Sequence, residues 1–373
     1  MKLTFQQDAI LNGINIVLKA VPSKTTMSIL ECIFIDASGS EIKLTANDME
    51  LGIETVVEGT IVERGKIALD AKLLSEIVRK LSSAGDSLVT IESDEKFTTT
   101  ISCENSVFHI QGRDGEEFAY LPYIERDHYI CLSQFTLKEV IRQTIFSIAA
   151  NDSNKMMTGE LFQVTGNELK VVSLDGHRIS IRNVELKDNY NDIKVIVPGK
   201  TLSEVSKILS GDNEKEVLIF FSKNHILFEF DHTIVVSRLI DGEYFRIDQM
   251  LSSDYETKST VNRRELLDCI ERATILIREN DKKPLIINLQ DQEMQLKMNS
   301  SFGSMNAEVN VHKTGSDIMI GFNPKFLIDA LRIIDDEEVT LYMLNPKSPC
   351  FIKDEEGKYI YLILPVNFNA ASV

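Results

Sequence analysis

The stretch Val195-Ile-Val-Pro-Gly-Lys-Thr-Leu-Ser-Glu-Val-Ser-Lys-Ile-Leu209 decides the fold. Its β-branched residues predict a strand, Pro-Gly predicts a turn, and apolar residues at helical spacing then predict an amphipathic helix. The pattern recurs upstream as Ile67-Ala-Leu-Asp-Ala-Lys-Leu-Leu-Ser-Glu-Ile-Val-Arg-Lys-Leu81. It recurs downstream as Ile320-Gly-Phe-Asn-Pro-Lys-Phe-Leu-Ile-Asp-Ala-Leu-Arg-Ile-Ile334. One strand–turn–helix unit is therefore present three times.

The three copies align residue by residue. Lys72, Lys200 and Lys325 align at intervals of 128 and 125 residues, and the apolar, acidic and basic positions around them align as well. A second repeated segment opens each third of the chain and predicts another amphipathic helix. The six predicted helices cover residues 6–19, 71–81, 136–148, 199–210, 262–278 and 324–334. We interpret the chain as a threefold internal repeat.

Short strands fill the space between the predicted helices. Turn residues such as Asp175-Gly176 and Glu356-Gly357 separate them. The predicted strands cover 30–35, 42–45, 88–91, 97–102, 107–111, 161–164, 169–174, 179–184, 217–221, 225–230, 233–239, 285–289, 295–298, 307–311, 339–344, 350–353 and 359–364. The expected fold class is α+β, with three tandem domains that each hold two helices and antiparallel sheets. Polar segments place the domains at 1–127, 128–252 and 253–373.

Composition narrows the class of protein. With 43% hydrophobic residues among 373, each third can bury a core of its own. The five cysteines are widely spaced and include no Cys-x-x-Cys pair, so we expect buried thiols and neither a metal nor another cofactor. The start of the chain has no apolar signal region, and no apolar run approaches the length of a membrane span. We expect a soluble cytoplasmic protein.

Charge is unevenly distributed along the chain. The six predicted helices carry a net charge of +6 in a chain of net charge −17, so the remainder carries −23. Lys and Arg are good helix formers, which is one explanation of this difference. The other is that the helices face a polyanion while the acidic remainder repels it elsewhere. Such a surface would bind DNA through its phosphates, without sequence preference.

The string Ser173-Leu-Asp-Gly-His-Arg-Ile179 is the strongest local signal. Asp-Gly between two β-rich runs predicts a hairpin turn. The corresponding tips, Asn47–Glu50 and Asn299–Phe302, lack Gly-His-Arg, so the fold does not require it. Two other function classes stay open at this point: a phosphate-ester hydrolase centred on Asp175 and His177, and an acidic scaffold that binds proteins but not DNA. The hydrolase would need a second catalytic group beside His177.

Together these features resemble one family over essentially the whole chain. Further matching motifs are Leu44-Thr-Ala-Asn-Asp-Met-Glu-Leu-Gly52, Val195-Ile-Val-Pro198, Ser237-Arg-Leu-Ile-Asp-Gly242, Met319-Ile-Gly-Phe-Asn323 and Tyr361-Leu-Ile-Leu-Pro-Val366. The ordered set is similar to the bacterial DNA sliding clamp, the β subunit of DNA polymerase III. The resemblance implies sliding-clamp domains in a head-to-tail homodimeric ring around duplex DNA. It implies a non-catalytic processivity factor for DNA replication that tethers the replicative DNA polymerase and also binds the clamp loader.

The resemblance also implies where these partners bind. A groove for short partner peptides would comprise Met157, Leu174, Gly176, His177, Arg178, Ile179, Phe245, Gln249, Met250, Leu362, Leu364, Pro365 and Val366. The residues facing DNA would be Lys24, Arg79, Lys80, Asn151, Lys155 and Lys200. The dimer interface would pair Phe108 and Ile110 with Ile275 and Leu276.

This sequence departs from the family pattern at several of these positions. Leu174 stands where the family usually has Thr, and Tyr244-Phe-Arg-Ile-Asp-Gln249 replaces a segment that normally carries Pro-Asp. Lys155 and Met156 occupy positions where the family can carry aromatic residues. The tail from Asn367 to Val373 runs past the usual end. The departures at 174 and 244–249 bear on the shape of the groove.

Overall fold

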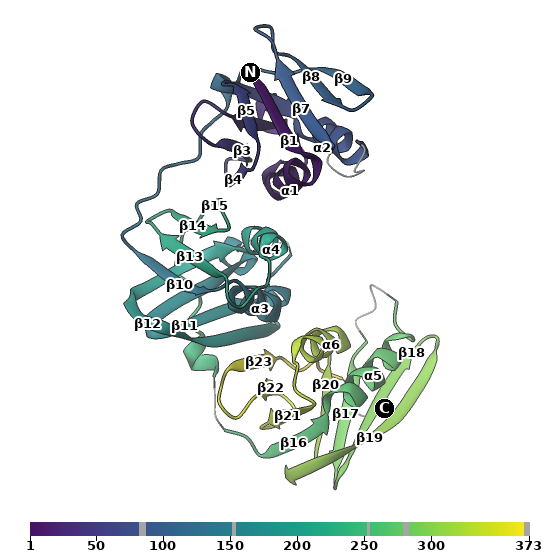
Figure 1. Cartoon of the computed structure of the whole chain (residues 1–373). Helices are drawn as coiled ribbons and strands as arrows, with labels where there is room; N and C mark the ends of the chain where they lie inside the picture. The colour runs from purple at the N-terminus through teal and green to yellow at the C-terminus, as the bar shows by residue number, and fades with distance from the viewer. Residues whose placement is uncertain (82–86, 151–153, 252–253, 279–282, 369–373) are drawn as a thin grey trace. The chain divides into compact units, whose positions relative to one another are not determined.

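The computed structural model describes residues 1–81, 87–150, 154–251, 254–278 and 283–368 (Figure 1). The chain divides into two compact units by its internal contacts. The first unit is Met1–Phe135 with Glu204–Leu239, and the second is Thr136–Ser203 with Ile240–Val373. The middle third of the chain therefore contributes to both units.

The six predicted helices are confirmed within the described residues. They are α1 Gln7–Val17, α2 Ala71–Lys80, α3 Gln134–Thr144, α4 Gly199–Ile208, α5 Arg263–Thr274 and α6 Pro324–Ile333. Short polar residues begin several of them, as side-chain caps do in general. Asp70 Oδ1 accepts a hydrogen bond from Leu73 N at 2.8 Å, and Asn262 Oδ1 accepts one from Glu265 N at 3.0 Å.

Pro-Gly in the repeated segment has a packing reason. β12 ends at Pro198, and α4 begins at Gly199. A Cβ atom on residue 199 would lie 2.2 Å from Ile148 Cδ1 and 3.0 Å from the Thr158 carbonyl oxygen. Only glycine allows this close approach between the start of the helix and its neighbours.

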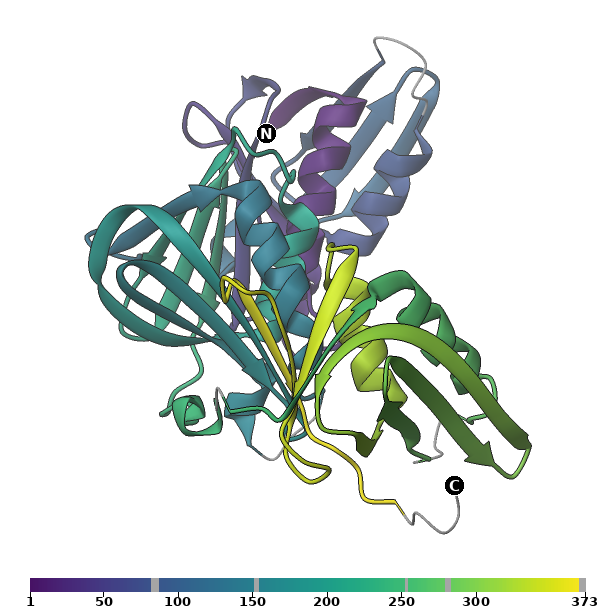
Figure 2. The same cartoon turned by 90° about the horizontal axis from the view of Figure 1, so that it is seen from below.

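The first unit contains two antiparallel sheets. One has the strand order β5-β1-β7-β8-β9, built from β1 Lys2–Gln6, β5 Thr60–Glu63, β7 Leu88–Ser93, β8 Thr98–Cys103 and β9 Ser106–Gln111. The other has the order β10-β13-β14-β15-β4-β3-β2-β6, built from β2 Cys32–Asp36, β3 Ile42–Asn47, β4 Leu51–Val57, β6 Lys66–Asp70, β10 Tyr129–Ser133, β13 Glu216–Phe221, β14 His225–Phe230 and β15 Thr233–Arg238. Helices α1 and α2 pack side by side in this unit (Figure 2). Because β15 pairs with β4, one sheet joins strands of the first and second thirds.

The second unit contains one long sheet of order β11-β12-β23-β22-β21-β16-β19-β18-β17-β20. Its strands are β11 Gly159–Leu174, β12 Arg178–Pro198, β16 Thr257–Asn262, β17 Leu285–Gln290, β18 Glu293–Ser300, β19 Gly303–Gly315, β20 Ile318–Phe322, β21 Glu338–Met343, β22 Cys350–Lys353 and β23 Tyr359–Ile363. The green strand β19 bends strongly along its length (Figure 2). Here β12 pairs with β23, so this sheet joins strands of the second and third thirds.

The strands depart from the sequence prediction in three places. The strands expected at 161–164 and 169–174 form the single strand β11, which absorbs the turn residues between them as register shifts around Gly166. β12 likewise continues from Arg178 through to Pro198 as one strand. β4 and β5 were not predicted. Gly52 lowers the strand propensity of β4, and the Leu121 side chain packs where a Cβ on residue 52 would lie.

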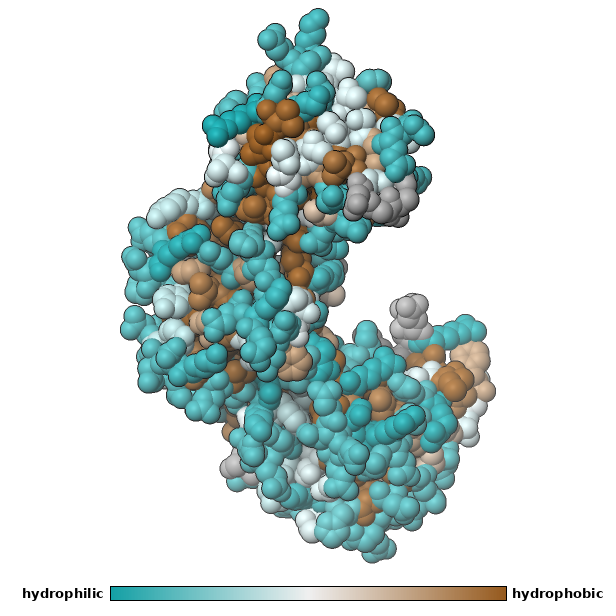
Figure 3. Space-filling view, viewed as in Figure 1, coloured by the Kyte–Doolittle hydropathy of each residue, from teal (hydrophilic) through white to brown (hydrophobic). Residues whose placement is uncertain are grey.

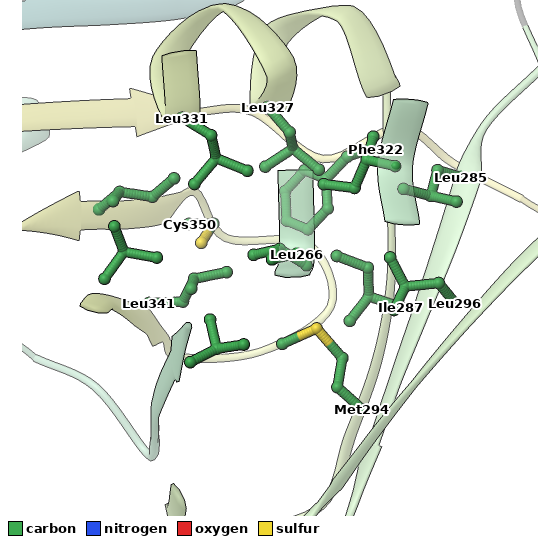
Figure 4. Packing of buried hydrophobic residues seen from close by; sticks show 14 of the residues in the cluster. Leu266, Leu285, Ile287, Met294, Leu296, Phe322, Leu327, Leu331, Leu341 and Cys350 are labelled. Atoms are coloured by element: carbon green, nitrogen blue, oxygen red, sulfur yellow. The ribbon is translucent and has the colours of Figure 1, made fainter. Parts of the chain in front are cut away.

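A hydrophobic core of the second unit lies between helices α5 and α6 and the strands of the last third of the chain (Figure 4). Leu266 on α5 and Leu327 and Leu331 on α6 are fully buried there, against Phe322 and Leu341 from the strands. Side chains at the three-to-four-residue spacing of a helix thus supply the inner face, as the repeat predicts. The core holds each helix in place against its sheet.

Most of the thiols are buried, as predicted. Cys32, Cys103, Cys269 and Cys350 are buried and Cys131 is partly buried, and all five are free cysteines. The side of the molecule seen in Figure 3 is mainly hydrophilic, which agrees with the acidic composition. Among the described residues, no helix has the length and apolar character needed to cross a membrane.

Candidate functional site

The candidate site begins at the tip of the β11–β12 hairpin, as the Asp-Gly turn predicts. Asp175 Oδ1 accepts hydrogen bonds from His177 N at 3.0 Å and from Arg178 N at 3.1 Å. Gly176 has φ of +84°, a conformation that glycine adopts without strain. Gly176 and His177 are exposed at the tip. The turn therefore presents a short polar loop beside the sheet.

Arg178 points into the protein instead of lining an open surface. Only 7% of the residue is exposed. Its Nε donates to Asp175 Oδ2 at 3.0 Å, and its Nη1 donates to Asp329 Oδ2 on α6 at 2.6 Å. The buried Arg178 side chain thus holds the hairpin tip in place. Arg178 would therefore affect a peptide groove through the conformation of the tip, and only slightly through direct contact with a peptide.

Apolar predicted residues meet beside the tip. Leu174 pairs with Ile179 across the hairpin, and Ile179 pairs with Leu362 on β23, so the three side chains form one row on one face of the sheet. All three are buried in one hydrophobic cluster, with Met157 and Phe245 partly buried against it. Leu174, the residue that departs from the family pattern, is therefore a packed member of this row.

The replaced segment at 244–249 also packs on this cluster. Tyr244 and Ile247 are buried in it, and the Tyr244 hydroxyl donates to the Val172 carbonyl oxygen at 3.2 Å. Burial raises the pKa of the Tyr244 hydroxyl. The short helix η6, Ile247–Met250, then leaves Gln249 and Met250 exposed, with Met250 52% exposed. Tyr244 and Ile247 were not among the predicted groove residues, although both are apolar and lie within two residues of Phe245 in the sequence.

The C-terminal segment completes the site. Beyond β23, Leu364 N donates to the His177 carbonyl oxygen at 2.9 Å, which continues the strand pairing to the tip. Leu364 is 38% exposed, and Pro365 and Val366 are partly buried. Leu364 and Met250 are exposed apolar residues, and Met157 and Phe245 are partly buried against the hydrophobic cluster beside the tip. Residues of this kind suit an apolar peptide side chain.

The same geometry gives no support to the hydrolase alternative. Both Asp175 carboxylate oxygens are engaged, by two backbone amides and by Arg178. The nearest aromatic partner of the His177 ring is Phe326, at 5.9 Å between centroids. In the part of the chain that the structure describes, no group of His, Cys, Asp and Glu side chains has the arrangement of a metal site. Asp175 and His177 do not form an acid–base pair.

The residues expected to face DNA are distributed over both units. Lys24, Arg79 and Lys80 are exposed in the first unit, with the last two at the end of α2. Lys155 begins the short helix η5, Lys155–Thr158, and Lys200 lies in the first turn of α4; both are exposed in the second unit. Asn151 lies outside the described residues. Arg79 and Lys80, at the C-terminal end of α2, also complement the helix dipole, so these two residues have a structural explanation of their own.

The expected interface residues lie in two apolar patches, and each patch has one exposed and one partly buried side chain. Phe108 and Ile110 lie on β9, the edge strand of its sheet, where Phe108 is 38% exposed. Ile275 follows α5 and is 81% exposed, while Leu276 packs partly against the core. An unpaired edge strand with apolar side chains is open to pairing with another chain. Two different patches on one chain suit a head-to-tail contact between identical copies.

Models of one protein family match the chain from end to end. The N-terminal domain of the DNA polymerase III beta subunit matches residues 1–122, the central domain matches 131–245, and the C-terminal domain matches 248–367. The three matches follow one another in the order of the repeat.

Individual relatives agree with these matches. The beta sliding clamp of Staphylococcus epidermidis is 32% identical, over 98% of this chain and 99% of that protein. The crystal structure of a putative DNA polymerase III beta subunit from Eubacterium rectale is 66% identical, with a TM-score of 0.96 over 99% of this chain and 100% of that one. The DNA polymerase sliding clamp of Bacillus subtilis is 32% identical, with a TM-score of 0.95 and the same coverage of both chains.

Proposed function

The chain belongs to the DNA polymerase III beta subunit family of DNA sliding clamps, and we propose that two copies close head to tail into a ring around duplex DNA. The observation that carries this proposal is the ordered match of three clamp domains along the whole chain. The domains are 1–127, 128–252 and 253–373, and two chains supply the six that close the ring. The chain is a processivity factor for DNA replication, and it performs no catalysis and needs no cofactor.

The ring holds DNA by topology more than by affinity. The contacts come from Lys24, Arg79, Lys80, Asn151, Lys155 and Lys200, five of which are basic. Phosphate contacts of this kind carry no sequence information, so the ring slides along the duplex. The acidic remainder of the chain keeps DNA off the other surfaces. The proposal places the protein in the cytoplasm, where the chromosome is replicated.

The ring closes through the two apolar patches. Phe108 and Ile110 on β9 of one chain meet Ile275 and Leu276 of the other. The exposure of Ile275 supports this assignment, because an aliphatic side chain that is 81% exposed in one chain gains stability when a partner covers it. A head-to-tail contact with the correct rotation closes into a ring.

Partners dock by short peptides in the groove beside the hairpin tip. Met157, Leu174, Ile179, Phe245, Leu362 and Leu364 supply apolar walls, Gly176, His177 and Arg178 form the tip, and Gln249, Met250, Pro365 and Val366 form the rim. The peptide carries an aliphatic–aromatic pair, which such walls bind well. The replicative DNA polymerase and the clamp loader both use this groove. Tethering raises the effective concentration of the polymerase at its template.

Titration of a Gln-Leu-x-Leu-Phe peptide tests the groove. Met157→Ala combined with Leu364→Ala removes two walls, and truncation of central anchors costs roughly 2 kcal/mol or more of binding free energy. The expected result in calorimetry is a loss of affinity of about thirtyfold or more, with the mass of the dimer unchanged.

The matched control is Met27→Ala with Leu73→Ala. These residues are 48% and 43% exposed, and both lie in the first third of the chain, so their loss should leave peptide affinity unchanged. Equal affinities for the wild type and the groove variant would place docking elsewhere.

A further inference from the structure

Arg178 joins three separate parts of the second unit. Its Nε reaches Asp175 at the hairpin tip, its Nη1 reaches Asp329 on α6, and its Nη2 donates to the Phe146 carbonyl oxygen at 2.6 Å. The guanidinium carbon also lies 5.3 Å from the Phe146 ring centroid and 4.6 Å from that of Phe326. Every nitrogen of the guanidinium therefore has a partner, and two aromatic faces enclose it.

The tip has further ties to the same helix and to the C-terminal segment. The His177 ring packs against Phe326 on α6, and the His177 carbonyl oxygen accepts the hydrogen bond from Leu364 N. Val366 N in turn donates to the Gly321 carbonyl oxygen at 2.8 Å, just before α6. The polar tip, the exposed Leu364 and helix α6 are thus held as one assembly around the groove.

The ion pair of Asp329 with the hairpin tip is not a general feature of the repeated fold. The aligned acids in the other two repeats are Glu76 and Glu204. Glu76 is exposed on α2, and Glu204 pairs with Lys207 on its own helix at 2.8 Å. Neither holds a hairpin tip. A buried guanidinium that loses one of its carboxylates is destabilised, so Asp329 is needed where Arg178 is present.

We propose that Asp329 is a positioning residue for partner docking, acting through Arg178 on the conformation of residues 175–178. This inference rests on the proposed peptide groove. Without Asp329 the guanidinium keeps Asp175, the Phe146 carbonyl and the Phe326 ring but loses its ion pair with α6, so the tip samples other conformations. A partner peptide then has to order the tip when it binds, and affinity falls. Asp329 itself touches no peptide.

The test titrates the same Gln-Leu-x-Leu-Phe peptide into full-length variants. Asp329→Asn should weaken binding about tenfold, the scale of one hydrogen bond to a charged group. Asp329→Glu keeps the charge and should bind more tightly than Asp329→Asn. Hydrogen exchange at the His177 and Arg178 amides, both held by Asp175, should accelerate in Asp329→Asn and not in regions remote from the tip.

Asp335→Asn is the matched control. Asp335 forms an ion pair with Arg142 of α3 at 2.7 Å. Asp335→Asn therefore removes an acid–arginine pair as Asp329→Asn does, but this pair does not involve the hairpin tip. Phe326→Leu is a second variant, which removes the ring beside Arg178 and His177 and should also weaken binding. Wild-type affinity in both Asp329→Asn and Phe326→Leu, or an equal loss in Asp335→Asn, would overturn the positioning role. A wild-type protein that binds no peptide would overturn both this inference and the groove.

Discussion

At the scale of single residues, Glu160 has an unusual environment beneath the docking region. It is fully buried, and its Oε2 lies 3.0 Å from Thr144 Oγ1, which is also 2.7 Å from the Val140 carbonyl oxygen. The Thr144 hydroxyl is the donor in the contact with Glu160. Burial raises the pKa of Glu160 well above its usual value, and the hydrogen bond with Thr144 offsets only part of this effect. Burial therefore favours the neutral form of the Glu160 carboxyl in the folded protein.

This predicts a loss of stability with rising pH that Glu160→Gln removes. In the unfolded chain the carboxyl ionises near pH 4.3, roughly its reference pKa, whereas in the folded protein it ionises only at higher pH. The folded state loses stability as pH rises from the unfolded pKa toward the folded one. We expect the Tm of Glu160→Gln to exceed that of the wild type by a margin that grows from pH 5 to pH 8.

Glu355→Gln provides the comparison, because the Glu355 side chain is 89% exposed and its loss should leave the pH profile unchanged. A Tm difference between the wild type and Glu160→Gln that stays constant from pH 5 to pH 8 would show that Glu160 ionises normally in the folded protein.

Single residues of the site were predicted unevenly from the sequence. The tip at Asp175 and Gly176 could be predicted, because Asp-Gly between strands has a local meaning. Leu362 and Ile179 could be placed from the resemblance, and the register confirms that they are neighbours. Asp329 could not be linked to the tip, because its contact with Arg178 spans 151 residues of sequence. A contact of that kind depends on tertiary packing that no local pattern encodes.

At the scale of elements, the helices were predicted best. α2 and α6 end within one residue of their expected ends, since the apolar period and the basic last turn mark them locally. The strands were harder to predict. Turn-forming residues such as Gly166 and Asn167 sit inside the continuous strand β11, where pairing with β12 outweighs their local preference.

The edge strand β9 and the end of α5 lead to a prediction about assembly. Ile275→Asp places a charge in the proposed apolar contact with β9 and should separate the dimer, because a buried unpaired charge is costly. Light scattering at micromolar concentration should give about twice the 42.1 kDa chain mass for the wild type and about 42.1 kDa for the variant.

Tyr123→Asp is the control for surface substitution, since Tyr123 is 89% exposed and lies outside both patches. It should remain dimeric. A monomeric wild type, or a variant Ile275→Asp that keeps the wild-type mass, would contradict the assignment of this interface.

At the scale of the whole molecule, the repeat predicted three domains, but it could not predict how strands are shared between them. The middle third contributes β15 to a sheet with β4 and β12 to a sheet with β23. These pairings join different repeats, so no periodicity within one repeat contains them. The division of charge, +6 on the predicted helices and −23 elsewhere, follows from the sequence alone. In a ring around DNA, the basic helices would face the phosphates.

Retention on DNA of defined topology distinguishes a closed ring from a protein that binds DNA only by surface contacts. The protein is loaded onto a nicked circular plasmid with a clamp loader and ATP, separated from free protein, and then followed after a single restriction cut. We expect the protein to stay on the closed circle at salt concentrations that abolish binding to linear DNA, because phosphate contacts weaken with salt and topology does not. We also expect its release once the circle is cut. Protein that remains on linear DNA with free ends, or that is never retained on the circle, would contradict a ring that encircles DNA.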